Sequence, residues 1–308
     1  MVRAVVTGAN GFVAGHLIDH LMAEGDTVLA LTRTNQCRLS LSQQLTTGVW
    51  DISTPASAGI VQQIREFNPD VVYHLAAISV RPRCGDSEPS AEAIQVNVKG
   101  SQHVAECCLE LPNVPKLIFT SSVYVYGSSY DKITKVKEEN DLSPDNGYGI
   151  SKLQAEEALK RYGETLPLII ARSFQHTGPG QSGSLLIPEW VQKIRSEPSP
   201  LEVYNLHTWI DYSDARDVAR AYRVLATEAT VGQIFNVGSG IAVRSGEILE
   251  TLQTMLRTSK EAIESKPGEN FLPIADIQKI VTDTSWQPKF TLQQTLRDFI
   301  KHLISESV

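Results

Sequence analysis

Short apolar runs alternate with stretches whose apolar residues recur at helical spacing through the first 172 residues. Leu17, Leu21 and Met22 share one helical face, and Gly25 ends that helix. Strands that alternate with helices form a parallel sheet covered on both faces, so the pattern predicts a doubly wound α/β fold. The runs that predict buried strands are residues 3–6, 27–31, 70–75, 116–120 and 166–171, with a shorter one around Val49.

Beyond Arg172 the pattern becomes irregular. Residues 178–181 are rich in glycine and residues 196–200 in serine and proline, which indicates a second, smaller lobe. Residues 233–237 predict a further strand of the main sheet, whereas the tail from Arg244 predicts helices and loops. We therefore expect two interleaved lobes, a larger one of residues 1–172 to which 205–240 return, and a smaller C-terminal one of residues 173–204 and 241–308.

The first strand runs directly into a glycine-containing turn, residues 7–15, and a helix follows at once. Glycines in such a turn let the backbone approach a pyrophosphate, and the helix N-terminus adds unpaired N–H groups and a favourable dipole. The first two glycines are three apart and Ala14 holds the place of the third, so an ordinary tight turn is the alternative. We expect residues 1–172 to form a dinucleotide-binding Rossmann domain and the smaller lobe to bind substrate. The expected cofactor-binding residues of the turn are Gly8, Asn10, Gly11, Phe12 and Val13.

Composition narrows the classes of function. The 308 residues are 42% hydrophobic and carry a formal net charge of −7, which argues against a nucleic-acid surface. No apolar run approaches the roughly 20 residues of a membrane helix, and the N-terminus enters a strand rather than a signal sequence, so we expect a cytoplasmic protein. Cys37, Cys84, Cys107 and Cys108 lack metal-ligand spacing, so we expect free thiols and no metal site.

Tyr148 and Lys152 open a predicted helix four residues apart, so the phenol and the ammonium lie on one face. A phenol has a reference pKa of about 10, which a nearby ammonium and a positively charged cofactor ring would lower. Tyr148 would then exchange protons with a carbonyl or hydroxyl group. Ser122 follows the strand 116–120, where its hydroxyl would hydrogen-bond the reacting oxygen. The alternatives are chance spacing for Tyr148 and Lys152 and a capping role for Ser122.

These motifs together resemble the extended short-chain dehydrogenase/reductase family, which includes the NAD-dependent epimerases and dehydratases. The resemblance covers nearly the whole chain and rests on Thr7-Gly8-x-x-Gly11-Phe12, His74-Leu75-Ala76-Ala77, Asn97, Ser121-Ser122 with Val125-Tyr126-Gly127, and Tyr148-x-x-x-Lys152. It implies a nicotinamide cofactor at the glycine turn, nucleotide-activated sugars as substrates, and Ser122, Tyr148 and Lys152 as the catalytic trio. It also implies that Lys152 holds the nicotinamide ribose, that Asn97 supports the active-site helix, and that His74 packs beside the cofactor. The other cofactor-binding residues that it implies are Asp51 and Ile52 against adenine, Leu75, Ala76, Ala77 and Phe174.

Within the family, residues 171–181, 235–240 and 285–289 look most like reductases of GDP-4-keto-6-deoxy-D-mannose. Dehydratases of the family carry an Asp-Glu pair after the catalytic hydroxyl, because removing water needs an additional acid and base. Val123 and Tyr124 fill that place here, and neither replaces a carboxylate. We therefore expect an NADPH-dependent reductase of a nucleotide-linked 4-keto-6-deoxy sugar. The alternatives are a nucleotide-sugar 4-epimerase and a non-catalytic NADP(H)-binding protein. Relatives often pair through two helices, so we also expect a homodimer that uses the helix of Tyr148.

The end of the second strand indicates which nicotinamide cofactor binds. An acidic residue there binds the ribose 2′-OH of NAD, whereas an arginine suits the 2′-phosphate of NADP. Thr32-Arg33-Thr34 stands at this point, and Arg38 is close enough in sequence to assist. NADP(H) is therefore favoured over NAD(H). This also favours net reduction, because NADPH is usually an exchanged reductant, whereas an epimerase keeps its cofactor and returns the hydride to the same sugar. The alternative for Arg33 is a solvated surface charge.

The substrate-binding candidates are Ser79, Gln175, Lys193 and Arg244. Relatives have Asn where this chain has Gln175 and Arg where it has Ile210, and the resemblance implies that this Arg binds the substrate diphosphate. Losing a hydrogen bond to a charged group, about 1.5–3 kcal/mol, weakens binding roughly tenfold to a hundredfold. His176 is either a substrate contact or a hydrogen-bonded loop histidine. The cations that would compensate for the missing Arg are Lys193, Arg244 or Lys266.

Overall fold

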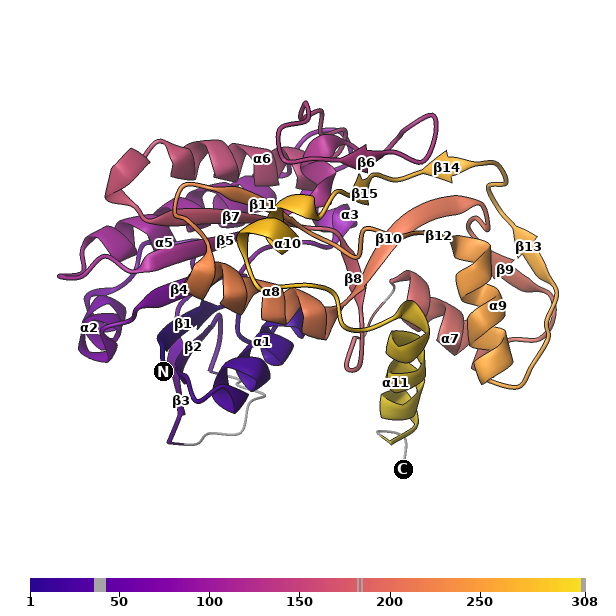
Figure 1. Cartoon of the computed structure of the whole chain (residues 1–308), viewed down its shortest axis with the longest axis horizontal. Coiled ribbons are helices and arrows are strands. Elements are labelled where there is room, and N and C mark those ends of the chain that lie inside the picture. Colours follow the sequence, from indigo (N-terminus) through magenta and orange to yellow (C-terminus); the bar gives the residue numbers. More distant parts are fainter. Residues whose placement is uncertain (36–42, 182, 184, 306–308) are drawn as a thin grey trace.

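A seven-stranded parallel sheet organises the molecule, with the strand order β11-β7-β5-β4-β1-β2-β3 (Figure 1). The computed structural model describes residues 1–35, 43–181, 183 and 185–305, so Cys37 and Arg38 lie outside the described residues. Each strand expected from the sequence is present to within two residues, which confirms the doubly wound α/β prediction. The strands of this sheet are β1 (Arg3–Thr7), β2 (Thr27–Thr32), β3 (Leu45–Val49), β4 (Val71–His74), β5 (Lys116–Ser122), β7 (Leu168–Ser173) and β11 (Ile234–Val237).

The sheet buries a separate apolar layer on each face, because successive side chains of a strand point to opposite sides. Ala4 and Val6 of β1 belong to the layer under α1 and α8, whereas Val5 belongs to the layer under α2, α5 and α6. Parallel strands covered on both faces end at one common edge, where ligands of such sheets bind. The helices of the two layers are α1 (Phe12–Ala23), α8 (Ala215–Glu228), α2 (Ala58–Phe67), α5 (Gly100–Leu109) and α6 (Gly147–Lys160).

Short helical segments lie in the connections between the strands and helices of the sheet. A π-helix precedes α5, and a 3₁₀ turn follows β5. These segments are α3 (Arg81–Cys84), α4 (Ala91–Ala93), the π-helix Ile94–Lys99, and the 3₁₀ turns Val123–Tyr126 and Gly163–Thr165.

The smaller lobe is built around β10 (Thr208–Asp214). This strand pairs antiparallel with β12 (Ala242–Arg244) and parallel with both β14 (Asn270–Phe271) and β8 (Gln175–Thr177). Helices α7, α9 and α11 contribute the apolar core of this lobe. The remaining elements are α7 (Leu186–Ser196), α9 (Ser245–Met255), α11 (Leu292–Ser305), the pair β9 (Leu201–Val203) and β13 (Ala262–Glu264), and the pair β6 (Lys135–Val136) and β15 (Ile274–Ala275).

Two segments lie elsewhere than the expected lobe boundaries put them. Strand β10 falls within residues 205–240, yet it belongs to the smaller sheet rather than to the main one. Helix α10 (Gln278–Asp283) and Trp286 come from the C-terminal tail, yet Ile280 and Trp286 pack into the core under α8. The Trp286 indole donates to the backbone oxygen of Asp217 on α8 (3.0 Å), which fixes the tail against the larger lobe. The lobe boundaries stay a proposal, amended at these points.

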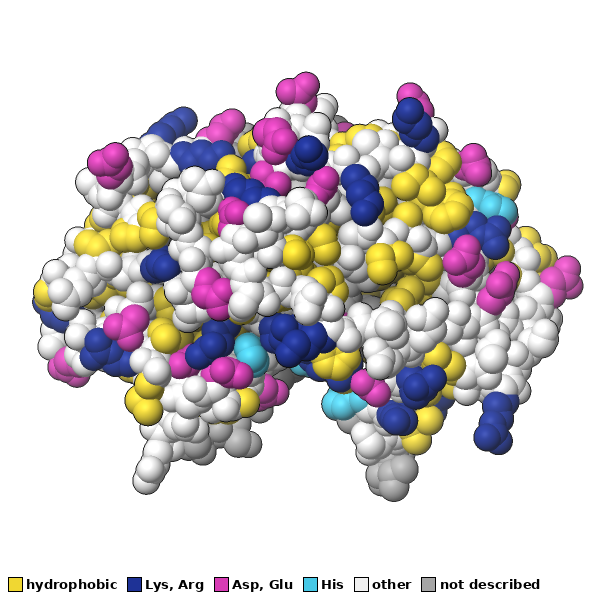
Figure 2. Space-filling view, viewed as in Figure 1, with side chains coloured by type: hydrophobic (Ala, Val, Ile, Leu, Met, Phe, Trp, Pro, Cys, Tyr) yellow, Lys and Arg dark blue, Asp and Glu magenta, His cyan; other side chains and the backbone are white. Residues whose placement is uncertain are grey.

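The outer surface carries charges of both signs. On the face shown in Figure 2, lysine and arginine side chains are interspersed with aspartate and glutamate. Within the described ranges no helix has both the length and the apolar character needed to cross a membrane. Nor do the described histidine, cysteine and acidic residues form a group that would hold a metal ion.

Candidate active site

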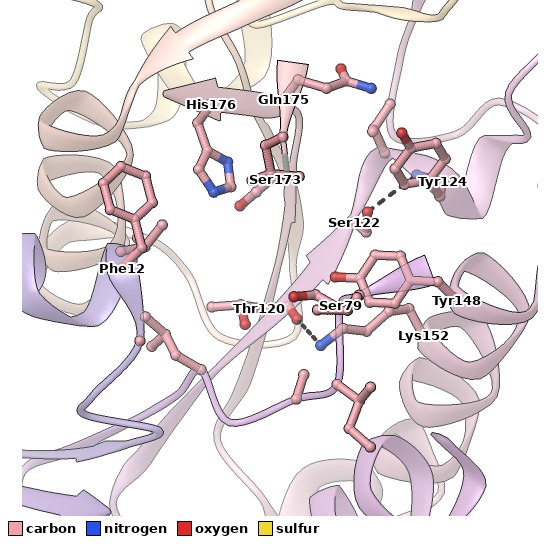
Figure 3. Close-up of a pocket in the computed structure, with 18 of the residues that line it drawn as sticks. Phe12, Ser79, Thr120, Ser122, Tyr124, Tyr148, Lys152, Ser173, Gln175 and His176 are labelled. Carbon is pink, nitrogen blue, oxygen red and sulfur yellow. Dashed lines mark hydrogen bonds between the residues drawn. The ribbon is translucent and has the colours of Figure 1, made fainter. Parts of the chain in front are cut away.

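A large cavity of about 1510 Å³ lies at the carboxyl edge of the main sheet and reaches into the smaller lobe (Figure 3). Its wall combines the glycine turn after β1, the ends of β2, β4 and β5, the start of α6, and β8 and β10. Pockets for a single small ligand usually measure about 300–1,000 Å³. This cavity therefore has room for a dinucleotide and a second molecule together.

The glycine turn fits a pyrophosphate. Gly8 has a φ of +70°, and a Cβ atom there would lie 2.7 Å from Cα of Ala76 in the neighbouring strand-end loop. Gly11 precedes α1 and has no side chain to cap the helix, so the first N–H groups of α1 are left for a ligand. Turn residues Gly8, Asn10, Gly11, Phe12 and Val13 all line the cavity.

Beyond the glycine turn, the end of the cavity beside β2 has room for an adenosine. Arg33 and Asp51 are exposed at its rim, and Ile52 is buried beneath them. Gly100 lets Ile52 pack closely, because a Cβ atom on Gly100 would lie 2.8 Å from Cδ1 of Ile52. No ion pair of Arg33 is found with any described residue, so its guanidinium is available to a ligand phosphate at this rim.

The three expected catalytic side chains converge on the middle of the cavity (Figure 3). Tyr148 and Lys152 come from the first turns of α6, and Ser122 comes from the end of β5. Gly149 allows this approach, because a Cβ atom there would lie 2.4 Å from the backbone oxygen of Tyr124. The Ser122 hydroxyl accepts a hydrogen bond from the Tyr124 N–H (3.3 Å), which holds it at the strand end.

Lys152 is buried and held by the main chain. Its ammonium donates to the backbone oxygen of Thr120 (2.8 Å) and lies 4.9 Å from the centre of the Phe119 ring. Burial lowers the pKa of Lys152 to about 8, against the opposing influence of Cys84 and Glu156. Lys152 is therefore a cation whose charge is easily lost above neutral pH.

The pKa of Tyr148 differs from the expectation. Burial raises the pKa of Tyr148 above its usual range and outweighs the hydrogen bond with Ser122, which lowers it. The expected lowering also needs a positively charged cofactor ring beside the phenol, so it stays a prediction for the cofactor complex. Burial thus favours the protonated form of the phenol, which is the form that a proton donor needs.

Asn97 lies behind the cavity rather than in its wall, which corrects its expected place among the cofactor contacts. Its side-chain oxygen accepts from the Ile78 N–H (2.8 Å), and its amide nitrogen donates to the Ile78 oxygen and to the Ser151 hydroxyl, both at 3.0 Å. Asn97 therefore ties the loop after β4 to α6, the supporting role that the resemblance implies. His74 is also buried, between Thr7 (2.8 Å) and Ser101 (2.9 Å), and burial lowers its pKa to about 3.

On the substrate side, Ser79 and Gln175 line the cavity, but Lys193 and Arg244 do not. Lys193 donates to the backbone oxygen of Glu202 (2.8 Å) and pairs with a neighbouring glutamate on α7. Arg244 lies 3.7 Å from Glu247 at the start of α9. Their expected role in substrate binding is therefore corrected, since both are engaged at the lobe's surface. Of the three cations expected to compensate for the missing Arg, Lys266 is the one that lines the cavity.

Two departures from the relatives lie in this wall. Ile210 is buried on β10 and lines the cavity, so an apolar side chain stands where the resemblance implies a diphosphate-binding Arg. Gln175 also lines the cavity, and both polar atoms of its amide are buried without a hydrogen-bond partner. A buried amide without partners is costly, by about 1–3 kcal/mol, unless a ligand satisfies it.

The chain is similar to a family of known proteins over most of its length. The sequence matches the NAD dependent epimerase/dehydratase family over residues 4–238. The chain belongs to this family. It is an NAD(P)-dependent oxidoreductase of the extended short-chain dehydrogenase/reductase type, so the non-catalytic alternative falls away.

Members of this family that resemble the chain act on nucleotide sugars. GDP-6-deoxy-D-mannose reductase from Pseudomonas aeruginosa is 27% identical over 306 residues, covering 96% of this chain and 95% of its own. The structure of RMD from Pseudomonas aeruginosa complexed with NADPH has a TM-score of 0.84 at 26% identity and covers 99% of this chain and 100% of that one. MoeE5 in complex with UDP-glucose and NAD has a TM-score of 0.83 at 25% identity and covers 99% of each chain. A nicotinamide cofactor is therefore supported for the chain.

Several cavity residues carry no motif and were missed from the sequence. Tyr222 of α8 and Ser173 of β7 share a hydrogen bond of 2.6 Å, and both line the cavity. These two residues are 49 positions apart in the sequence, so no local pattern indicates that they form a pair. Tyr124 lies edge-on to the Tyr148 ring, with ring centres 6.1 Å apart. Of these residues, only Tyr124 gave a signal in the sequence, because the resemblance implies a carboxylate at this place in dehydratases.

Proposed function

We propose that this chain is an NADPH-dependent reductase of a nucleotide-linked 4-keto-6-deoxy sugar similar to GDP-4-keto-6-deoxymannose. The observation that carries the proposal is the convergence of Tyr148, Lys152 and Ser122 on a cavity that also contains the glycine turn. No carboxylate stands at Val123 or Tyr124, which supports reduction over dehydration. The similarity to GDP-6-deoxy-D-mannose reductase supports the same class of substrate.

The proposed mechanism assigns a separate task to each side chain. The nicotinamide, when bound, supplies the hydride that reduces the carbonyl carbon. Ser122 and Tyr148 donate hydrogen bonds to the carbonyl oxygen and so orient it. Tyr148 then transfers its proton to that oxygen as negative charge develops there. The Lys152 ammonium, held by the Thr120 carbonyl, stabilises the resulting phenolate and binds ribose hydroxyl groups.

NADP(H) is the proposed cofactor, and the reason is the rim beside β2. Arg33 presents a guanidinium there, and Thr34 lines the same wall. A guanidinium binds a phosphate through two parallel hydrogen bonds, whereas it gives no such advantage with a ribose hydroxyl. NAD(H) remains the alternative cofactor.

The experiment that tests the proposal is a turnover assay. Purified protein is mixed with NADPH and GDP-4-keto-6-deoxymannose, and the absorbance of the reduced nicotinamide is followed while the sugar product is identified. We expect one NADPH to be oxidised per sugar reduced. The UDP- and dTDP-linked keto-sugars, tested in parallel, identify the preferred base. No oxidation with any of these sugars would contradict the reductase assignment.

A 4-epimerase is the second candidate, because Tyr148 and a hydride carrier serve both reactions and because relatives include an uncharacterised UDP-glucose epimerase of Bacillus subtilis. An epimerase would retain its cofactor through purification and would invert a UDP- or GDP-hexose without net oxidation of NADPH. Observing that pattern would replace the reductase with the epimerase.

We also propose that the chain acts in the cytoplasm as a homodimer that pairs through two helices, one of them α6. Light scattering of the purified protein should then give the mass of two chains. A monomer at micromolar concentration would contradict the dimer.

A further inference from the structure

An ion pair that no step of the proposed reduction uses lies in the wall of the main cavity. Arg83 of α3 donates two hydrogen bonds to the Glu92 carboxylate of α4, one of them from Nε to Oε2 at 3.3 Å. Both residues line the cavity, as does Arg33 at the end of β2. Two guanidiniums and one carboxylate are thus available to a ligand of this cavity.

The contacts between neighbouring segments place the pair at the same end of the cavity as Arg33. Strand β3 pairs with β2, so the residues that follow β3 lie beside Arg33. One of them, Ser53, accepts a hydrogen bond from the Gln95 amide through its backbone oxygen (2.5 Å). Gln95 lies three residues beyond Glu92, and α4 continues without a break into the π-helix that carries Gln95. Glu92 and Arg33 therefore both border the adenosine end.

The segment that carries the ion pair is held in place by other contacts. The Ser90 hydroxyl accepts from the Ala93 N–H (3.0 Å) at the start of α4 and donates to the backbone oxygen of Arg83 (2.6 Å). The Ser90 N–H donates to the backbone oxygen of Cys84 (2.8 Å). Because these bonds do not involve the side chains of Arg83 and Glu92, exchanging either side chain changes the charge at the rim more than the fold of the segment.

Glu92 is a charged group that a ligand phosphate can displace. The hydrogen bond from Arg83 holds the pKa of Glu92 below its usual range, and the charges of Arg83 and Arg33 act in the same direction. The other carboxylate at this rim, Asp51, accepts a hydrogen bond from the Ser53 N–H (3.0 Å). The side chains of Arg83 and Glu92 are 47% and 49% exposed, and water and salt weaken so exposed a pair. A phosphate monoester carries nearly two negative charges at neutral pH, so it attracts the Arg83 guanidinium more strongly than one carboxylate does.

We propose that Arg83 and Glu92 are cofactor-specificity residues, because the Glu92 carboxylate competes with the ribose 2′-phosphate of NADP(H) for the guanidiniums of Arg83 and Arg33. Arg83 attracts that phosphate and Glu92 repels it, whereas NAD(H) carries only a hydroxyl group at the same place. In the free protein Arg83 is paired with Glu92, and the bound 2′-phosphate takes the place of that carboxylate. The inference rests on the proposed binding of NADP(H) and not on the identity of the sugar.

Two opposite changes of charge test the proposal. Glu92→Gln removes the negative charge and frees Arg83, so the Kd for NADPH should fall about three- to fivefold. Arg83→Gln leaves the carboxylate without its partner, so the Kd for NADPH should rise by a similar factor. The Kd for NADH should stay within about twofold in both variants, because a ribose hydroxyl is uncharged. Fluorescence titration of each reduced cofactor, at low ionic strength and without sugar, measures these values.

The matched control is the ion pair of Arg3 with Asp70, whose side chains are 45% and 49% exposed and which lies outside the wall of the cavity. Asp70→Asn and Arg3→Gln make the same two changes of charge and should alter neither Kd. Glu92→Asp keeps the negative charge and should bind both cofactors as the original protein does. Thermal unfolding midpoints establish that each variant is folded.

Three results would overturn the proposal. A higher Kd for NADPH in both Glu92→Gln and Arg83→Gln would show that the pair only holds α3 and α4 together. Equal shifts for NADPH and NADH would assign the effect to a group that both cofactors share, such as the adenine. Unshifted Kd values would show that neither charge reaches the cofactor. The original protein tests the proposed cofactor separately, because a lower Kd for NADH than for NADPH would contradict the NADP(H) proposal, whereas opposite shifts in the two variants would still assign the competition to Glu92.

Discussion

At the scale of single residues, the proposed chemistry depends on two buried groups whose pKa values move in opposite directions. Burial favours the neutral form of each group, so it raises the pKa of Tyr148 and lowers that of Lys152 to about 8. The protonated form of the phenol is therefore favoured, and in this form it would donate a proton to a substrate carbonyl. The ammonium, in contrast, is charged only up to about pH 8.

Tyr148→Phe removes the proposed proton donor and little else, because the ring that packs against Tyr124 is kept. General acid catalysis contributes about 100- to 10,000-fold, so we expect kcat to fall by that factor. The Kd for NADPH should change little. Steady-state assays and fluorescence titration measure the two quantities. Retained turnover would eliminate Tyr148 as the acid.

The pH dependence of NADPH binding tests Lys152. The folded pKa of about 8 lies below the ordinary 10.5, so the ammonium is present below pH 8 and is lost as the pH rises above it. Because the ammonium is proposed to bind the ribose, the Kd for NADPH should be constant from pH 7 to about 8 and then rise as the charge is lost. Lys152→Gln should bind weakly at every pH and show no such bend. A bend that survives in Lys152→Gln would assign it to another group.

Arg33→Ala tests the preference for NADPH. Loss of the guanidinium should raise the Kd for NADPH about tenfold, the lower end for a hydrogen bond to a charged group at this exposed rim. The Kd for NADH should not change, since NADH has no 2′-phosphate. Arg65→Ala on α2, outside the cavity wall, is the control. Equal effects of Arg33→Ala on both cofactors would contradict the NADP(H) proposal.

At the scale of elements, α6 is fixed to the sheet by a buried ion pair one turn beyond Lys152. Glu156 on α6 accepts two hydrogen bonds from Arg172 of β7, at 3.0 and 2.8 Å, and a third from Ser121 of β5 at 2.5 Å. Arg172 also donates to the Tyr126 hydroxyl (3.0 Å). The helix that carries Tyr148 and the strand that leads to β8 are thereby held in one register.

Arg172→Met leaves the buried Glu156 carboxylate without its cation. Breaking such a pair on one side costs about 3–5 kcal/mol, so the free energy of unfolding should fall by that amount. Lys160→Met removes the exposed partner of the same carboxylate, 3.6 Å away, and should cost at most about 0.5 kcal/mol. Denaturant unfolding measures both. Similar losses in the two variants would show that burial does not decide the strength of this pair.

The sequence was most informative for candidate functional residues that follow the end of a strand or begin a helix. The glycine turn, Ser122 and the Tyr148–Lys152 spacing are local patterns, and the parallel sheet gathers them at one edge by topology alone. The partners that support them were not visible, because a backbone oxygen such as that of Thr120 has no sequence signature. The role of Asn97 in bridging Ile78 and Ser151 likewise depends on a fold-level contact.

At the scale of the whole molecule, the substrate side of the cavity depends on how the smaller lobe docks against the main sheet. Its wall brings together residues of β8, α7, β10 and the loop before β14, which share no motif. From the sequence, three cations were equally good candidates to replace the Arg that is missing at Ile210. Only the packing of the smaller lobe distinguishes them. Lys266 reaches the cavity, while Lys193 and Arg244 are held at the surface by glutamates.

Lys266→Ala tests whether this cation replaces the diphosphate-binding Arg that Ile210 has displaced. The loop of Lys266 is anchored, because the Asn205 amide donates to the Lys266 oxygen at 2.7 Å and the ammonium lies 5.8 Å from the Tyr204 ring centre. We expect the KM for the nucleotide sugar to rise about tenfold, with kcat and the Kd for NADPH unchanged, because the charge acts on a distant part of the substrate. Lys193→Ala is the matched control and should alter none of these.

An attraction between exposed charges also weakens with salt, so the KM of the original protein should rise with ionic strength more steeply than that of Lys266→Ala. Parallel salt dependences would assign the diphosphate to the neutral donors of the wall, with Gln175 the first among them.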